Sequence, residues 1–359
     1  MKNIYTLVLI CTLAFSASAQ NRSSIQQEGN HHRAEVTQQG GSTANITQGG
    51  SHHTAEVQQQ GGNTAEVQQG GNDNTAKVTQ DGENNTADIS QQGSSHSAYI
   101  RQAGYGFTAN QQQGGFGNRA YALQHHTIAA ARESSITQEQ NGSNNYAAAV
   151  QLFSSGSSIT QTQGANSQLN KAVTLQAGSG NTASITQNGS NNNGFLSENS
   201  ENLASQFQEM FGLGDGIIPS NIDGYSFLDF QLAGQVQIGK DNRMSLEQNG
   251  SNNSALQVQI GQNNHMSLEQ NGSRKSATLV QIGNGNSIDH VQDGNELFET
   301  DLYINDVPII DMKSETSGAG TLLYQQGNFN TIDHNFNGME GIRVTQYGDY
   351  ATVKVTTVK

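Results

Sequence analysis

Glutamine recurs along this chain at a fixed interval of eleven residues, and no other feature limits its fold as strongly. The interval is kept by two groups of glutamines, one in each half of the chain: Gln69, Gln80, Gln91, Gln102, Gln113 and Gln124, then Gln237, Gln248, Gln259, Gln270, Gln281 and Gln292. A constant interval over many units is typical of repeat proteins, in which each unit packs mainly against its neighbours. The chain is therefore expected to fold as a stack of similar units.

The residues around each glutamine predict one β-strand and one turn per unit. Positions recur as Gln-x-Gly-x-x-Asn-x-Ala-x-Val/Ile-x-Gln, most cleanly between Gln69 and Gln91. Asn, Ala, Val or Ile, and Gln are spaced two residues apart, which places them on one face of a strand, whereas Thr75, Lys77 and Thr79 face the other way. The Gly-x-x step breaks this alternation with residues that tolerate tight reversal of the chain.

A second period, twice as long, is visible in the C-terminal half. Met244–Ser251 and Met266–Ser273 have the same sequence, and the tetrapeptide VQIG begins at Val236, Val258 and Val280. Two strand-turn units then make one coil, and the equivalent residues of successive copies lie above one another in neighbouring coils. The predicted fold class is all-β: a two-sheet β-solenoid of stacked strand-turn-strand repeats, with about 22 residues per coil and about 11 per strand-turn.

Stacking explains how a buried face can consist of glutamine and asparagine. Identical amides in successive coils hydrogen-bond along the stack, which satisfies groups whose unpaired burial costs about 1–3 kcal/mol each. Ala and Val or Ile add apolar burial between the two sheets. The positions expected to form these structural ladders are Gln69, Asn74, Ala76, Val78, Gln80, Asn85, Ala87, Ile89, Gln91, Gln113, Asn118, Gln124, Gln140, Asn145, Gln151, Gln176, Asn181, Gln187, Gln237, Gln248, Asn253, Gln259, Gln270, Gln281 and Gln292.

Composition excludes several other classes of protein. Hydrophobic residues make up 33% of the chain and Trp is absent, which argues against an ordinary globular core, while a charged fraction of 13% argues against charge-rich disorder. The net charge of -14 comes with no basic stripe, so nucleic acid is not an expected partner. Neither a Gly-x-Ser-x-Gly elbow nor a His-Glu-x-x-His motif occurs, and we expect neither enzymatic activity nor a cofactor.

The N-terminus reads as a secretory signal peptide over residues 1–19. Lys2 precedes an apolar run, and Ala17-Ser18-Ala19 supplies the small residues of a cleavage site. Cys11, the only cysteine, lies inside this segment, so the expected mature chain beginning at Gln20 has no disulfide. Secretion is therefore expected.

Two stretches without the repeat divide the rest of the chain. We expect repeat arrays over 20–194 and 232–294, interruptions over 195–231 and 295–322, and a C-terminal β segment over 323–359. Within the first interruption, apolar residues at helical spacing predict a short amphipathic helix from about Ser200 to Gly212 that packs on or caps the stack: Leu203, Phe207, Met210 and Phe211.

Three histidine pairs, His31-His32, His52-His53 and His125-His126, are the candidates for a copper or zinc site. Neighbouring residues of a strand point to opposite sides, so a pair does not converge on one ion. The sequence favours histidines solvated at the turns, with no metal site.

Two glutamates occupy equivalent outward positions one coil apart, Glu247 and Glu269. Like charges there would repel each other and slow stacking, so both are candidate gatekeepers against premature assembly.

The repeat resembles that of the curlin family, the subunits of curli fibres. The full unit of that family is matched by Ser134-x5-Gln140-x-Gly142-x2-Asn145-x-Ala147-x3-Gln151. Its shorter core recurs from Gln113 to Gln124, from Gln176 to Gln187 and from Gln248 to Gln259. The Asn is replaced in some units, by His32, His96, Phe107 or Lys275, and these substitutions are expected to weaken individual ladders.

The resemblance implies a secreted amyloid subunit that assembles on the cell surface and contributes to biofilm matrix and adhesion. It also implies self-association, a nucleator or major subunit as partner, and export through an outer-membrane pore with accessory factors. Whether this chain is the major subunit or the nucleator stays open. The alternative is a monomeric β-solenoid adhesin whose outward Thr, Ser and Asn rows bind a surface, a glycan or ice.

Overall fold

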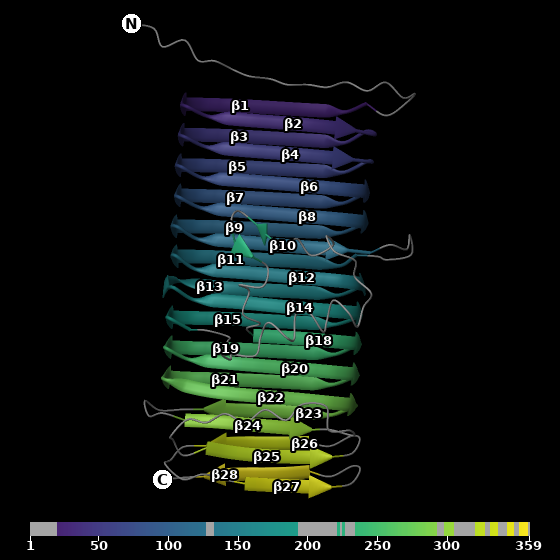
Figure 1. Ribbon diagram of the computed structural model, residues 1–359, viewed down its shortest axis with the longest axis vertical. Coiled ribbons are helices and arrows are strands. Elements are labelled where there is room, and N and C mark those ends of the chain that lie inside the picture. Colours follow the sequence, from purple (N-terminus) through teal and green to yellow (C-terminus); the bar gives the residue numbers. More distant parts are fainter. Residues whose placement is uncertain are drawn as a thin grey trace, which may run out of the picture.

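The computed structural model describes residues 20–126, 133–192 and 234–292 in full and, beyond these, the backbone of strands at 221–222, 225–226 and between 298 and 357. It confirms the all-β, two-sheet solenoid (Figure 1). The chain passes from one sheet to the other at almost every turn, and each sheet contains 13 strands, all paired in parallel. No helix occurs among the described residues.

We call the two layers the first sheet and the second sheet. In spatial order, the first sheet contains β1 (Arg22–Asn30), β3 (Thr43–Ser51), β5 (Thr64–Asn72), β7 (Thr86–Ser94), β9 (Thr108–Phe116), β11 (Ser135–Ser143), β13 (Ser158–Gln168), β15 (Thr182–Ser190), β19 (Arg243–Ser251), β21 (His265–Ser273), β23 (Ser287–Gln292), β26 (Thr331–Phe336) and β28 (Thr352–Thr357). The second sheet contains β2 (Arg33–Gln39), β4 (Thr54–Gln60), β6 (Thr75–Glu83), β8 (Ser97–Tyr105), β10 (Arg119–His125), β12 (Tyr146–Ser155), β14 (Lys171–Ser179), β18 (Gly234–Lys240), β20 (Ser254–Gln262), β22 (Lys275–Asn284), β24 (Phe298–Ile304), β25 (Gly320–Gln326) and β27 (Arg343–Tyr347).

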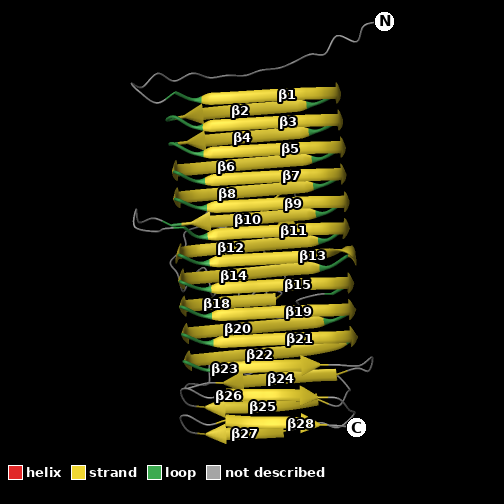
Figure 2. Cartoon of the chain, turned by 180° about the vertical axis from the view of Figure 1, so that it is seen from behind, coloured by secondary structure: helices red, strands yellow, loops and turns green. Residues whose placement is uncertain are grey.

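The register places like residues over like residues. Thr64 pairs with Thr86 and Gln69 with Gln91, so the coil length expected from the sequence is observed. The first coils are one residue shorter, because Thr43 pairs with Thr64. Figure 2 shows the resulting ladder of strands from behind, with short loops at both edges.

Alternate residues of each strand point into the narrow space between the sheets. In β6, Ala76, Val78 and Gln80 are buried, while Thr75 is exposed and Lys77 and Thr79 are half-buried. The inward Ala, Val, Ile, Leu and Met side chains form two successive apolar clusters along the stack. The alternation predicted from the sequence therefore sets which face of each strand is buried.

Glycine makes the sharp reversal at each arch feasible. Gly71 has a φ of 99°, a region that L-residues rarely adopt, and a Cβ placed on it would collide with the carbonyl oxygen of Gly93 in the next coil. The same arrangement recurs at Gly50 and Gly250. At these arches glycine is required both by the backbone conformation and by the close spacing of the coils, whereas Ser167 occupies the equivalent position opposite Gly142.

The sequence interruptions are absorbed without loss of register. β15 pairs with β19 across the first interruption, with Thr182 opposite Arg243, and the segment between them contains a two-stranded antiparallel pair, β16 (Asn221–Ile222) and β17 (Tyr225–Ser226). The helix expected from Ser200 to Gly212 lies outside the described residues. The interval 295–322, expected to interrupt the repeat, contains β24, which pairs with β22 on one side and β25 on the other.

Within the part of the chain that is described, no helix is long and apolar enough to cross a membrane.

Candidate functional site

Two columns of glutamines run through the interior, one on each sheet. In the first sheet, Gln69 Nε2 donates to Gln91 Oε1 at 2.8 Å, and Gln91 Nε2 donates to Gln113 Oε1 at 2.9 Å. The column is continuous from Gln27 to Gln292, and every donor–acceptor distance lies between 2.7 and 2.9 Å. The second sheet holds an equivalent column from Gln38 to Gln281, with distances of 2.8–3.1 Å.

The second amide hydrogen of these glutamines ties the two sheets together. Gln91 Nε2 also donates to the backbone oxygen of Thr75 at 2.9 Å, and Gln80 Nε2 donates to that of Thr64 at 3.0 Å. Each acceptor belongs to a strand of the facing sheet. Both hydrogens of Gln80 and Gln91 are thereby satisfied by groups of the protein itself, which is the condition for burying such a group at little cost. Gln281, the last glutamine of its column, differs, because its Nε2 is buried with no hydrogen-bond partner among the described residues.

Both columns have the same polarity. In every step the Nε2 donor belongs to the coil nearer the N-terminus and the Oε1 acceptor to the coil nearer the C-terminus. Each column ends where the residue at the paired position of the next strand is not a glutamine: Gln281 lies opposite Ile304, and Gln292 lies opposite Phe336.

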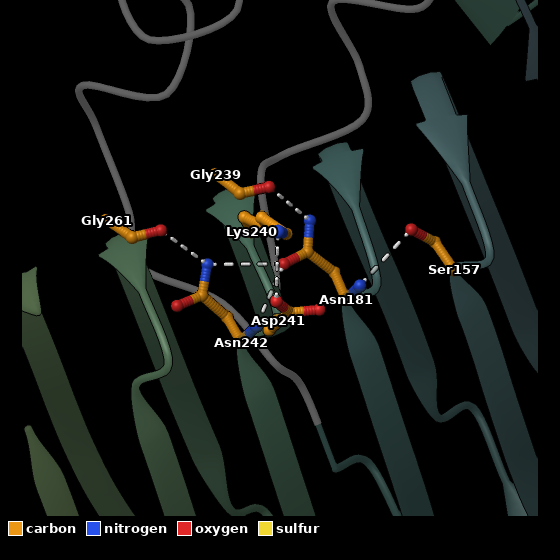
Figure 3. Close-up of polar contacts among 7 residues, drawn as sticks. All are labelled: Ser157, Asn181, Gly239, Lys240, Asp241, Asn242 and Gly261. Carbon is orange, nitrogen blue, oxygen red and sulfur yellow. Dashed lines mark hydrogen bonds and ion pairs between the residues drawn. The ribbon is translucent and has the colours of Figure 1, made fainter. Parts of the chain in front are cut away.

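Asparagines form further columns at the turns. Asn181 Nδ2 donates to the backbone oxygen of Gly239 at 3.1 Å, and its Oδ1 accepts the backbone N–H of Asn242, one coil on, at 3.1 Å (Figure 3). Asn242 repeats the pattern with Gly261 at 3.0 Å. Each asparagine therefore satisfies backbone groups of its own coil and of the next, at the place where the strand hydrogen bonds end.

Histidine takes the asparagine role at three turns. The backbone N–H of Asn74 donates to His53 Nδ1 at 3.2 Å, and His53 Nε2 lies 3.0 Å from the backbone oxygen of Gly49. His96 makes the same two contacts, with Asn118 and Gln92. His96 and the related His32 thereby contact backbone groups as Asn does at other turns, because an imidazole protonated on Nε2 presents both an acceptor and a donor. That these substitutions weaken individual ladders stays a prediction.

The prediction of solvated turn histidines is correct for His31 and His52 and wrong for His53, which is fully buried. The rings stack between coils, with centroids 4.8 Å apart for His31 and His52 and 5.1 Å apart for His32 and His53. The described residues contain no group of three or more side chains suited to hold a metal ion.

Burial lowers the pKa of His53 and His96, since desolvation disfavours the charged imidazolium and only part of this is offset by the hydrogen bonds to backbone oxygens. A group with a lowered pKa in the folded state binds its proton more readily in the unfolded chain. The two histidines therefore contribute most to stability above the unfolded value near 6.5, and this contribution is lost as the pH falls below it.

Additional buried glutamines were missed by the sequence pattern, which has Val or Ile at their positions. Gln111 Nε2 donates to Gln138 Oε1 at 2.7 Å, Gln138 to Gln161 at 2.8 Å, and Gln235 to Gln257 at 2.9 Å. Gln111 precedes Gln113 by two residues, so the alternation itself placed it on the inward face. They form two short, additional amide columns beside the main ones.

The two candidate gatekeepers lie on the outward side of the first sheet and pair in register. Each carboxylate accepts a hydrogen bond from an asparagine two residues further on, Glu247 from Asn249 at 2.8 Å and Glu269 from Asn271 at 2.6 Å. Among the described residues, neither carboxylate forms an ion pair with a cation. The two like charges are therefore stacked one coil apart without a neutralising partner.

Fold and interior together define a class: a parallel β-solenoid whose core consists of in-register amide columns. The family model described as "Curlin associated repeat" matches residues 82–107 and 239–272, one stretch in each predicted array. Over these two stretches the chain is similar to the curlin repeat, and the matches support an assignment to the curlin repeat family. No curated protein matches the chain.

A shorter match, to the "RIP homotypic interaction motif", covers residues 278–288. This stretch includes the last VQIG tetrapeptide, in β22. There Gln281 points inward and accepts from Gln259 Nε2 at 2.8 Å, whereas Val280 and Ile282 point outward. The VQIG tetrapeptide within this match pairs in register with the one that begins at Val258, which in turn pairs with the one that begins at Val236.

Proposed function

We propose that the chain is a secreted structural subunit of a curli-like amyloid fibre, and that its function resides in self-stacking. The observation that carries this proposal is the in-register parallel pairing, which runs through both sheets and begins and ends on strands with a single neighbour. β1 and β2 terminate one end of the sheets, and β28 and β27 terminate the other. Among the described strands these four have one neighbour each, and a strand edge of this kind is a template for a further copy.

The backbone register supports head-to-tail addition. Gln281 lies opposite Ile304, Ile304 opposite Gln325, and Gln325 opposite Gln346, so glutamine returns to this register position after the break at Ile304 and occupies it in β27. The same column starts at Gln38 in β2. A second copy stacked below would bring its Gln38 position under Gln346, which continues the column across the junction. Because the contact joins two different ends, the assembly is open and grows as a filament.

In this proposal the ladder residues act as structural groups that set the register between copies, and Glu247 and Glu269 delay stacking. Residues 1–19 direct secretion, and family resemblance adds export through an outer-membrane pore with accessory factors, a nucleator or major subunit as partner, and roles in biofilm matrix and adhesion. No enzymatic activity, cofactor or nucleic acid is part of it.

The test uses purified residues 20–359, followed by amyloid-dye fluorescence, electron microscopy and fibre diffraction. We expect self-seeding fibres with one reflection at about 4.7 Å and another at about 10 Å. A chain that stays monomeric and β-rich at high concentration would instead support the surface-, glycan- or ice-binding adhesin.

A matched pair of variants tests the junction. Gln38 is buried and Gln39, its neighbour, is exposed. Gln38→Lys should slow seeded growth at least about tenfold, because it places an unpaired charge at the end of the column, whereas Gln39→Lys should grow as the parent does. Equal growth of both variants, with unchanged circular dichroism of the monomers, would contradict head-to-tail stacking through this column.

A further inference from the structure

The outward face of the second sheet changes character along the stack. One register column reads Thr37, Gln58, Thr79 and Arg101 in the N-terminal coils. The same column continues as Leu123, Val150, Leu175, Val236, Val258 and Val280. The column beside it ends in Leu152, Ala177, Ile238, Ile260 and Ile282. From β10 to β22 this outer face is therefore a continuous apolar strip.

These outward side chains are nevertheless removed from solvent. Leu123 is 1% exposed, Val150 3% and Val258 7%, whereas Thr37 and Gln58, at equivalent positions of the same column, are exposed. Outward residues of the first sheet, such as Gln112 and Thr160, are exposed as well. The buried apolar cluster on this face consists of second-sheet outward residues and the adjoining Phe153, so its own members do not account for the burial.

The length and the ends of the connection between β15 and β18 make it the best candidate to lie on this strip. This connection, residues 193–233, follows Asn192 in the chain and precedes Gly234, which pairs with Val173 in the middle of the apolar face. The connection at 127–132 has too few residues to extend over the six strands from β10 to β22. Residues beyond Gln292 continue the stack at its far end, where β24, β25 and β27 extend the second sheet past β22.

Composition and charge agree with this placement. The connection is rich in large apolar residues that are rare in the repeats, among them Phe195, Phe207, Phe211, Phe227 and Phe230. It carries six carboxylates and no Lys, Arg or His: Glu198, Glu201, Glu209, Asp215, Asp223 and Asp229.

The strip offers the complementary charge. Arg101, Arg119 and Lys171 lie on outward positions of β8, β10 and β14, beside the apolar columns. No Asp or Glu occupies a described outward position of the second sheet between β8 and β22.

We propose that the outer face of the second sheet from β8 to β22 is an intramolecular docking surface for residues 193–233. The aromatic and aliphatic side chains of the connection bury the strip, and its carboxylates lie toward the basic margin. This contact leaves the polar outer face of the first sheet as the broad surface presented to solvent. It concerns the single chain and does not depend on whether the chain forms fibres.

Photo-crosslinking of the monomer, residues 20–359, identifies the occupant directly. The photoreactive residue p-benzoylphenylalanine replaces Leu175, in the apolar column of the strip, in one variant and Thr160, on the first sheet, in the control. We expect Leu175 variants to crosslink to peptides from 193–233 within one molecule, and Thr160 variants not to do so. Crosslinks confined to 127–132, to residues beyond 292 or to a second molecule would each overturn the proposal.

Hydrogen exchange supplies an independent measurement. Val258→Asp should accelerate amide exchange in peptides from 193–233 by at least about tenfold, because a buried unpaired carboxylate disfavours the docked state. Gln112→Asp, exposed on the first sheet, should leave it unchanged. If Val258→Asp fails to fold, Phe207→Ser with Phe211→Ser provides the same test through increased binding of a hydrophobic dye. Unchanged exchange, or unchanged dye binding, would refute the docking.

Discussion

Replacing a single ladder glutamine by leucine should cost more than its size suggests. Gln91→Leu removes the partner of Gln69 Nε2, at 2.8 Å, and of Gln113 Oε1, at 2.9 Å, and it deprives the backbone oxygen of Thr75 of a donor. Each buried group left unpaired costs about 1–3 kcal/mol. The apolar gain from leucine offsets about 1–2 kcal/mol of the total. We expect a net loss of about 3 kcal/mol in the free energy of unfolding.

The neighbouring residue gives a matched control. Gln92 has the same side chain and is exposed, so Gln92→Leu should change stability by less than about 0.5 kcal/mol. Urea unfolding followed by circular dichroism measures both variants. Equal losses for the two would refute the assignment of the inward amide as a structural group.

A triple variant separates the free-energy cost of broken amide–amide hydrogen bonds from the cost of backbone oxygens that lose a donor. Replacing Gln69, Gln91 and Gln113 by Leu leaves only Gln48 Nε2 and Gln140 Oε1 without ladder partners, the same number as for the single variant. The backbone oxygens that lose a donor rise from one to three, on Thr54, Thr75 and Ser97. The triple variant should therefore cost clearly less than three times the single one. Strict additivity would show that the amides do not act as a column.

The remaining predictions concern the arches, pH and assembly. Gly50→Ala, at a φ of 121° and facing the carbonyl oxygen of Gly71, should destabilise by more than about 2 kcal/mol, whereas Gly49→Ala, with open space around its Cβ position, should be nearly neutral in the same urea assay. The parent should lose stability relative to a His53→Asn, His96→Asn variant as the pH falls below about 6.5, because the lowered pKa values keep both imidazoles neutral in the fold. Urea unfolding at pH 7.5 and 5.5 measures this difference, and an equal change in stability for the two proteins would contradict the prediction. Glu247→Gln with Glu269→Gln should shorten the lag before fibre formation, whereas Glu56→Gln, whose carboxylate pairs with Lys77 at 3.1 Å, should not; an unchanged lag for the first would remove the gatekeeping role.

The sequence alone predicted the coil because its information is periodic. Gln69, Gln80 and Gln91 stand eleven residues apart, and alternation then settles which side chains face inward. Length differences between coils, such as the pairing of Thr43 with Thr64, change the spacing without changing the strand pattern. These features can be read from neighbouring residues, and the same features recur in every repeat unit.

Features that depend on substitution within the repeat were harder to anticipate. His96 reads as a departure from Asn in the sequence, and only the positions of its two ring nitrogens show that it meets the same backbone groups. The apolar outer strip had a signal that went unused: the run Ala147–Val150 loses the alternation, as strands buried on both faces do. The register needed to join that run with Val236 and Val258 across the interruption came only from the structure.

The long connection, residues 193–233, occurs once per chain, between β15 and β18. Each sheet has 13 strands along the length of one subunit. With strands about 4.7–4.9 Å apart, a subunit spans about 60 Å along the axis. End-to-end polymers would then carry a bulge on one side at that interval. Averaged micrographs of such filaments should show a weak layer line at this subunit spacing beside the strong strand reflection. The spacing of that layer line would allow the subunits along a filament to be counted.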